Sequence, residues 1–298
     1  MNRVMAILAV PAVGLGLLVA VLWGPGADTV GTSEPLPVSQ IALSDRQLFL
    51  PHSLDEATAQ RICGDHDTNV EVGGTAGIGP HHLPFSAPVL WKLYADLAAA
   101  NTVVTRIILL GPDHNDAGAG PVTSAAVEYE TSLGRVRGDP LFVEDLIASG
   151  YVTLDSGPLT EEHAIYSHIP YIRRFFPEAA LVPVLFRSDV RTEEAAALGH
   201  YLSGAVGLDT LVILSSDLSH YRSRSEAETE DVLTVSILRS LDGSRLMDAR
   251  FDARPAARAL FSYLADRGVS AGTVLCRSNS ADLGGDSGNT TGYAGIVY

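Results

Sequence analysis

Apolar residues along this chain fall into two patterns that alternate from about residue 68 to the end. One pattern is a short run of branched apolar residues, which is typical of strands buried on both faces of a sheet. It predicts strands at residues 103–110, 180–186, 210–214, 273–277 and 292–298, and a further strand is expected at residues 70–78, which are strand-like but rich in Gly. The other pattern repeats an apolar residue every three or four positions and predicts helices. These helices are expected at residues 86–100, 141–148, 166–176, 192–206, 226–241 and 255–265.

Strands that alternate with helices in this way predict an α/β fold, with a mainly parallel or mixed central sheet and helices on both faces. The chain has 298 residues and shows no internal repeat, so we expect a single α/β domain at residues 45–298. Ahead of this domain, we expect a linker at residues 24–44, which begins with a stretch rich in Gly, Pro, Ser and Thr.

Residues 1–23 are expected to form a separate membrane-directed segment. An apolar run without charge extends from Val4 to Trp23, which is about the 20-residue length that spans a bilayer. Arg3 precedes the run and acidic residues follow it, so the domain is expected on the extracytoplasmic side. We favour an uncleaved membrane anchor, and a cleaved signal peptide is the alternative. In either case the domain is exported, as a membrane-anchored or a secreted protein.

The net charge of the chain is −15, and its pI is near 4.9. Binding to nucleic acid depends on clustered Lys and Arg that contact phosphates, so we expect no nucleic-acid partner. The same acidity argues against a basic patch that would lie on an anionic lipid surface.

The chain contains two cysteines, Cys63 and Cys276. An exported domain permits a disulfide, but the sequence does not reveal whether the two Cα atoms approach closely enough, so the pairing stays open. Neither cysteine belongs to a Cys-x-x-Cys pair, which argues against a thiolate metal site.

Three histidines follow predicted strands at the points where those strands end. His81 follows Gly-Ile-Gly-Pro, and His114 follows Leu-Gly-Pro-Asp, so a rigid proline turn directs each imidazole. His220 ends the segment Ser-Ser-Asp-Leu-Ser-His after a third strand. Because ligands bind outside the carboxyl ends of the strands in open α/β sheets, these imidazoles can converge on one metal ion or substrate.

Acidic residues accompany two of these histidines. Asp217 lies three residues before His220, and a carboxylate at this spacing raises the basicity of the ring, which suits a general acid or base. A neighbouring acid, Asp113 or Asp116, could orient His114 through its second ring nitrogen.

A further acid and histidine, Glu162 and His163, lie in a stretch predicted as helix or loop. They can join the same cluster, or Glu162 can simply cap a helix. Two serines, Ser215 and Ser216, invite a serine-nucleophile interpretation, but the Gly-x-Ser-x-Gly elbow is absent.

Taken in order, these segments resemble the Memo family, also known as AmmeMemoRadiSam system protein B. The resemblance covers roughly residues 45–298 and rests on the ordered set, because no single motif is decisive. The matching segments are Pro80-His81, Leu110-Gly111-Pro112-Asp113-His114, Thr131-Ser132-Leu133-Gly134, Glu162-His163-Ala164-Ile165, Ile169-Pro170-Tyr171, Val182-Pro183-Val184-Leu185 and Ser215-Ser216-Asp217-Leu218-Ser219-His220.

The resemblance implies a fold similar to that of class III extradiol dioxygenases, which use non-haem Fe(II). It implies that His81 and His114 occupy metal-ligand positions and that His220 occupies the position of the acid/base histidine. His163 and Asp217 would line the same pocket. Family members are implied to bind iron or copper, and a functional link to AMMECR-type and radical SAM proteins is implied as well.

The cysteine ligand of the family is missing from this chain. Anchoring the comparison on Pro255 places Phe251 at that position, and a shift of one residue brings Asp252 there instead. With Asp252, two histidines and one carboxylate would form the facial triad of Fe(II) oxygenases. A carboxylate in place of a thiolate favours harder ions such as Fe(II) over Cu(I). The alternative is a site that has no third ligand.

Three functions remain open at this point. The first is a metal-dependent, dioxygenase-like oxidoreductase with Fe(II), or else copper, at His81, His114 and Asp252. In it, the catalytic side chains are those of His220, His163 and Asp217. The second is a non-catalytic module that binds a small molecule or a peptide in the same cleft. The third is a hydrolase that uses metal-bound water, which needs three protein ligands and an open position.

Overall fold

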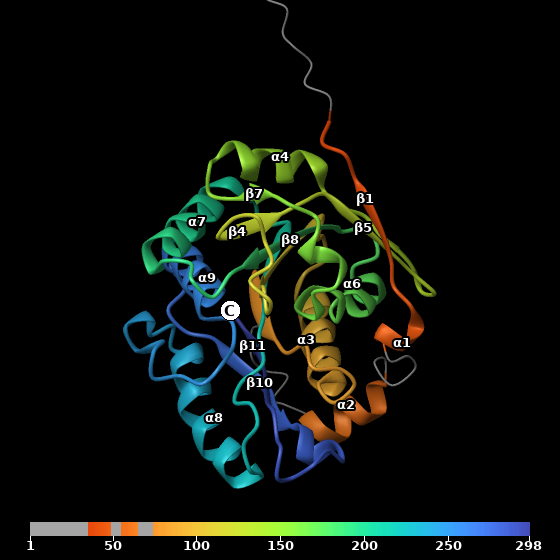
Figure 1. Cartoon of the computed structure of the whole chain (residues 1–298). Helices are drawn as coiled ribbons and strands as arrows, with labels where there is room; N and C mark the ends of the chain where they lie inside the picture. The colour runs from red at the N-terminus through yellow and green to blue at the C-terminus, as the bar shows by residue number, and fades with distance from the viewer. Residues whose placement is uncertain (1–34, 49–54, 65–73) are drawn as a thin grey trace, which may run out of the picture. The chain divides into compact units, whose positions relative to one another are not determined.

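An eight-stranded sheet forms the centre of the computed structural model, which describes residues 35–48, 55–64 and 74–298 (Figure 1). Across the sheet, the strands are β10 (Thr273–Asn279), β11 (Gly292–Val297), β2 (Ala76–Gly79), β9 (Thr210–Ser215), β3 (Arg106–Pro112), β8 (Ala180–Phe186), β4 (Val122–Ser124) and β7 (Thr153–Leu154). The middle strands β2, β9, β3 and β8 run parallel, whereas β10, β11 and β4 form antiparallel pairs. The predicted α/β fold with a mixed, mainly parallel sheet is confirmed.

A smaller sheet contains β1 (Ser39–Ala42), β5 (Val127–Thr131) and β6 (Gly134–Val136). β1 falls within residues 24–44, where we expected a linker, and it pairs in parallel with β5. Neither these strands nor β4 and β7 were predicted, because strands of two to five residues carry too few apolar positions to reveal a period of two.

The helices are α1 (Asp45–Leu48), α2 (Glu56–Cys63), α3 (Ala87–Ala100), α4 (Pro140–Ala148), α5 (His163–Tyr166), α6 (Ile169–Phe175), α7 (Thr192–Ala205), α8 (Arg224–Arg239) and α9 (Arg254–Asp266). Short 3-10 turns are η2 (Pro158–Thr160), η3 (Gly243–Arg245) and η4 (Ser280–Leu283). The helix predicted at residues 166–176 is divided between α5 and α6. Pro170 lies in the first turn of the second of them, since proline suits the first turn of a helix but interrupts its interior.

Alternate residues of the central strands point to opposite faces of the sheet. Ile108 and Leu110 of β3 join an apolar cluster with α7 and α9, whereas Ile107 and Leu109 join a cluster with α3 and α6. Figure 1 shows α7 and α9 on one side of the central strands and α3 and α6 on the other. Because both faces are covered, the strand is apolar throughout, which is why it appears in the sequence as an unbroken run.

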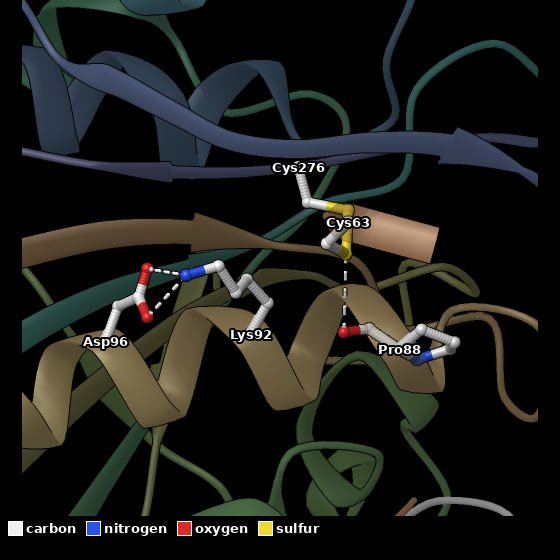
Figure 2. The surroundings of a disulfide bond; sticks show 5 residues. All are labelled: Cys63, Pro88, Lys92, Asp96 and Cys276. Carbon is white, nitrogen blue, oxygen red and sulfur yellow. Dashed lines mark hydrogen bonds and ion pairs between the residues drawn. A yellow bond between two sulfur atoms is a disulfide. The ribbon is translucent and has the colours of Figure 1, made fainter. Parts of the chain in front are cut away.

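Cys63 and Cys276 form a disulfide that joins the end of α2 to β10 (Figure 2). Both cysteines are buried, and Cys63 Sγ lies 3.7 Å from the carbonyl oxygen of Pro88 in the first turn of α3. Further along α3, Lys92 and Asp96 form an ion pair. The structure therefore answers the question that the sequence left open, and neither cysteine is free to bind a metal ion.

No helix in the described part of the chain is long and apolar enough to cross a membrane. The apolar run Val4–Trp23 lies outside the described residues, as does the first part of the predicted linker. The membrane anchor and its alternative, a cleaved signal peptide, therefore stay predictions.

Candidate metal centre

The three strands that precede the histidines are neighbours in the sheet, in the order β2, β9, β3. They are parallel, so their carboxyl ends lie at the same edge. His81 follows β2, His114 follows β3, and His220 lies in the loop after β9. The sheet thus brings together the three strand ends that the sequence singled out.

The carboxylate of Asp252 lies where these histidines meet. Its Oδ2 atom is 3.2 Å from Nε2 of His81, 3.7 Å from Nε2 of His114 and 3.9 Å from Nε2 of His220. The side chain of Asp252 is only 14% exposed, so it points into the cluster and away from solvent. This carboxylate occupies the loop before α9, far from the histidines in sequence.

The loop after β9 holds Asp252 in place. The hydroxyl of Ser216 donates a hydrogen bond of 2.8 Å to Oδ1 of Asp252, which leaves Oδ2 to face the imidazoles. The backbones of Asp217 and Asp252 also approach each other, with 3.4 Å between N of Asp252 and the carbonyl oxygen of Asp217. The two loops are therefore linked at the site.

His81 has the most deeply buried side chain of the cluster, at 0% exposure. Its backbone N–H donates to Asp217 Oδ1 at 2.9 Å, and its Nδ1 lies 2.9 Å from Ser215 Oγ. Its Nε2 makes no well-directed hydrogen bond among the described residues, and it faces the Asp252 carboxylate oxygen at 3.2 Å. A metal ion bound between these two atoms would satisfy both of them.

His114 is held by Glu162, and the expectation that Asp113 or Asp116 would hold it was wrong. Glu162 Oε1 lies 2.8 Å from Nδ1 of His114, and Glu162 Oε2 accepts the His114 backbone N–H at 3.0 Å. Asp113 instead accepts the N–H of Gly118, and Asp116 accepts hydrogen bonds from Ser188. Both aspartates are occupied in their own loops, which the sequence could not reveal.

Glu162 has both of the roles that were considered for it. As the N-cap of α5, it accepts the backbone N–H of Ala164 at 2.9 Å. It also lies 3.2 Å from Nδ1 of His163. The ring of His163 stacks on that of His114, with 4.3 Å between the centroids, and is 41% exposed. His163 therefore lies beside the cluster, on its solvent side.

Asp217 and His220 line the same site from the loop after β9. Asp217 is buried, and its Oδ2 lies 3.7 Å from Nε2 of His81 and 3.8 Å from Nε2 of His220. The His220 side chain is 30% exposed, so it contacts both the cluster and solvent. The structure thus brings together all six side chains predicted for the site.

Charges within the cluster shift the pKa values of its members. Burial opposes protonation of His114, but the carboxylates of Asp252 and Glu162 outweigh this effect and raise its pKa to about 10. Burial likewise opposes protonation of His81, and Asp217 and Asp252 raise its pKa overall. Burial alone would raise the pKa of Asp252, yet the histidines around it hold that pKa well below its usual range. The carboxylates of the site therefore stabilise positive charge at its centre, whether that charge is a protonated imidazole or a bound metal ion.

The distances from Asp252 Oδ2 to the three imidazoles approach, without all matching, the spacing of ligands on one metal ion. Atoms bonded to a single ion at about 2.0–2.2 Å lie roughly 3–3.5 Å apart. The distance from His81 to Asp252 fits this range, and the distances from Asp252 to His114 and His220 exceed it slightly. Among the described residues, two groups lie close enough to hold an ion, namely His81 with His114 and His163, and His81 with Asp217 and Asp252.

Sequence reasoning missed the residues behind His81. Ser215 lies between His81 and His168, and His168 contacts the hydroxyl of Tyr94. His168 is completely buried. The only signal in the sequence was a polar residue just before the apolar segment that begins α6, which by itself does not distinguish a network from a core histidine.

Comparison with known proteins agrees with these features. The Memo-like protein family matches residues 56–297. A MEMO1 family protein of Pyrobaculum aerophilum is 29% identical over 243 residues, which cover 76% of this chain and 85% of that protein. A MEMO1 family protein of Pyrobaculum arsenaticum is 30% identical over 235 residues, which cover 74% of this chain and 82% of that protein.

Among solved structures, the uncharacterized protein JW3007 from Escherichia coli K12 has a similar fold. The match has a TM-score of 0.50 at 13% identity and covers 75% of this chain and 99% of that chain. At this identity, the likeness concerns the fold alone.

Proposed function

The chain belongs to the Memo-like protein family, and from this premise we propose that it holds one non-haem Fe(II) ion at His81, His114 and Asp252. The observation that carries the proposal is the approach of three imidazole Nε2 atoms to one carboxylate oxygen. Two imidazoles and a carboxylate are the donor set of non-haem Fe(II) oxygenases. Copper is the second candidate, and it ranks lower because Cu(I) prefers sulfur ligands.

The proposed activity is that of a dioxygenase-like oxidoreductase. Bound at this site, the ion would supply redox and Lewis-acid chemistry to a substrate. His220 is proposed to take up and release protons at Nε2, since its ring is partly exposed and lies 3.8 Å from the buried Asp217 carboxylate. His163, stacked on His114 at the solvent side, is proposed to orient the substrate.

A cavity of about 180 Å³ beside His220 and Asp252 is the proposed place for the substrate. Its lining includes three arginines, Arg222, Arg250 and Arg254. Arg222 is paired with Glu230, whereas Arg250 forms no ion pair within the described ranges. In a chain with a net charge of −15, this local gathering of arginines favours a small ligand that carries a carboxylate or similar anionic group.

The same cavity supports the second candidate function, a non-catalytic module that binds a small anionic molecule. The two functions differ in their need for the metal and for His220. A catechol with a carboxylate substituent, supplied with Fe(II) and O2, separates them. Ring cleavage that is lost in His220→Ala supports the oxidoreductase, and tight binding without any cleavage supports the binding module.

Elemental analysis of purified protein, loaded anaerobically with Fe(II), tests the metal site itself. Wild type is compared with a His81→Ala/His114→Ala variant and with His82→Ala. His82 is a suitable control because its ring contacts Tyr293 instead of the cluster, with 2.9 Å between its Nδ1 and the Tyr293 hydroxyl. We expect about one bound iron in wild type and in the control, and almost none in the double variant. Equal and negligible iron in all three proteins would overturn the proposal.

We further propose that the domain lies outside the cytoplasm, attached to the membrane through residues 1–23. The uncharged apolar run in that segment and the disulfide between Cys63 and Cys276 support this location, because disulfides persist in oxidising compartments. External protease added to spheroplasts, which expose the outer face of the inner membrane, should digest the domain. Protection of the domain until the spheroplasts are lysed would contradict an exported location.

A further inference from the structure

A buried chain of hydrogen bonds leads from His81 away from the proposed metal. Nδ1 of His81 lies 2.9 Å from Ser215 Oγ, and this same oxygen lies 3.1 Å from Nε2 of His168. Nδ1 of His168 then lies 2.9 Å from the hydroxyl oxygen of Tyr94. None of these four residues is more than 1% exposed, so water does not compete for the bonds. The four residues come from different elements of the fold, so tertiary packing holds this series of hydrogen bonds together.

Ser215 couples the two imidazoles because its hydroxyl carries only one proton. When His81 carries its proton on Nδ1, Ser215 accepts that bond and donates to Nε2 of His168. His168 must then carry its own proton on Nδ1. When Ser215 donates to His81 instead, every bond in the chain reverses, and His168 carries its proton on Nε2.

The neutral state of His168 limits the chain to these two arrangements. Burial lowers the pKa of His168 to about 3, and the charge on His81 acts in the same direction. His168 therefore always offers one donor nitrogen and one acceptor nitrogen. Tyr94 keeps its proton, because burial raises its pKa well above the usual value.

We propose that His168 is a positioning residue that acts through Ser215 to fix which ring nitrogen of His81 carries the proton. A metal ion at His81 Nε2 needs the lone pair on that atom and the proton on Nδ1. This is the arrangement in which His168 Nε2 accepts the proton of Ser215. The coupling between the rings exists without a metal, whereas its contribution to metal binding rests on the proposed function.

Removal of the acceptor nitrogen of His168 shows what this series of hydrogen bonds contributes to metal affinity. In His168→Phe, Ser215 keeps its proton but loses one of its two ring partners, so it donates to Nδ1 of His81. The His81 proton is then placed on Nε2, where the metal must bind. Binding must reverse this arrangement and leave a buried hydroxyl unpaired, so we expect Zn²⁺ to bind about tenfold or more weakly.

Long-range ¹H–¹⁵N correlation spectra, which report the protonated nitrogen of each imidazole, test the coupling. Spectra are recorded for Zn²⁺-loaded wild type, and for wild type and Asp252→Asn in the presence of a chelator. Asp252→Asn removes the negative charge that faces Nε2 of His81, so it changes the preference of the His81 proton between Nδ1 and Nε2 without a metal. In every state we expect His168 to be protonated on Nδ1 whenever His81 is. A state with the His81 proton on Nδ1 and the His168 proton on Nε2 would overturn the proposal.

The two proposals fail in different ways in this experiment. If Zn²⁺ leaves the His81 signals unchanged, the metal site at His81 is wrong, while the two chelated samples still test the coupling between the rings. If Zn²⁺ binds at His81 while the His81 proton is on Nδ1 and the His168 proton is on Nε2, the metal site stands and the role of His168 is wrong.

Zn²⁺ affinity measured by calorimetry provides a second test. His168→Phe is compared with His168→Gln, whose carbonyl oxygen can accept the proton of Ser215, and with His82→Phe, the same change outside the chain of bonds. We expect weaker binding only in His168→Phe, with affinity largely restored by Gln. Wild-type affinity in a folded His168→Phe protein, or an equal loss in His82→Phe, would contradict the positioning role.

Discussion

The strand ends that carry His81 and His114 hold their imidazoles by opposite means. The ring of His81 is buried, and its Nδ1 meets the neutral hydroxyl of Ser215. The side chain of His114 is 27% exposed, and its Nδ1 meets the carboxylate of Glu162. A carboxylate makes an imidazole a stronger ligand than a hydroxyl does, since hydrogen bonds to charged groups are about twice as strong. One proposed ligand, His114, is thus supported by a charge near the surface, and the other, His81, by a neutral hydrogen-bond network in the core.

Asp252 is the point at which these two regions meet, so its loss should have the largest effect. Asp252→Ala removes the carboxylate oxygen that Nε2 of His81 and Nε2 of His114 both approach. The two imidazoles then share a site without the negative charge that lies between them. We expect metal affinity to fall by more than about 100-fold, which exceeds the usual loss for a residue behind the ligands. A metal titration followed by calorimetry measures it. Affinity within tenfold of wild type would remove Asp252 from the ligand set.

Glu162→Gln should have the next largest effect, confined to the His114 side. The amide keeps the shape of the side chain but removes the charge that supports the His114 ring. We expect metal affinity to fall by about 10- to 100-fold, as is typical for carboxylates that support a ligand histidine. Glu161→Gln, at the neighbouring exposed position, is the matched control. Equal affinity in the two variants would show that the charge behind His114 is unimportant.

Ser215→Ala should weaken metal binding less than Glu162→Gln does, because it removes a neutral hydrogen bond on the His81 side. We expect a loss of about tenfold in the same titration. Ser86→Ala is a suitable control, since Ser86 is equally buried and its hydroxyl finds no hydrogen-bond partner in the described chain. If Ser215→Ala lost more affinity than Glu162→Gln, the contrast between the two strand ends would be reversed.

Removal of the disulfide should leave the metal affinity unchanged, because Cys63 and Cys276 link α2 to β10 and contact neither strand end. The free energy of unfolding of Cys63→Ala/Cys276→Ala should still fall by about 2–5 kcal/mol. Urea unfolding and the metal titration, carried out on the same protein, measure both quantities. A weaker metal affinity in the folded variant would reveal coupling between the disulfide and the site.

The fold and the positions of the site were largely predictable from the sequence. Buried strands appear as unbroken apolar runs, and the rule for strand ends then placed His81, His114 and His220 at one edge of the sheet. Asp252 was predicted through a family resemblance together with a shift of one residue. The structure brings its carboxylate to the histidines, which no local pattern could have done.

The partners of the histidines were not predictable in the same way. Glu162 supports His114 across a long separation in sequence, whereas the nearer Asp113 and Asp116 are occupied by backbone groups of their own loops. His168 precedes α6, and Ser215 ends β9. They come together because α6 packs on the sheet face to which Leu211 and Ile213 of β9 point. Such pairs depend on tertiary packing, and their sequence signals are single polar residues in apolar segments.

Anomalous diffraction at the iron edge, from crystals loaded anaerobically with Fe(II), tests the central claim most directly. The proposal predicts one peak at about 2.0–2.3 Å from Nε2 of His81, from Nε2 of His114 and from a carboxylate oxygen of Asp252. A peak bound by His163 with Asp252 turned away, or no peak at this cluster, would contradict it.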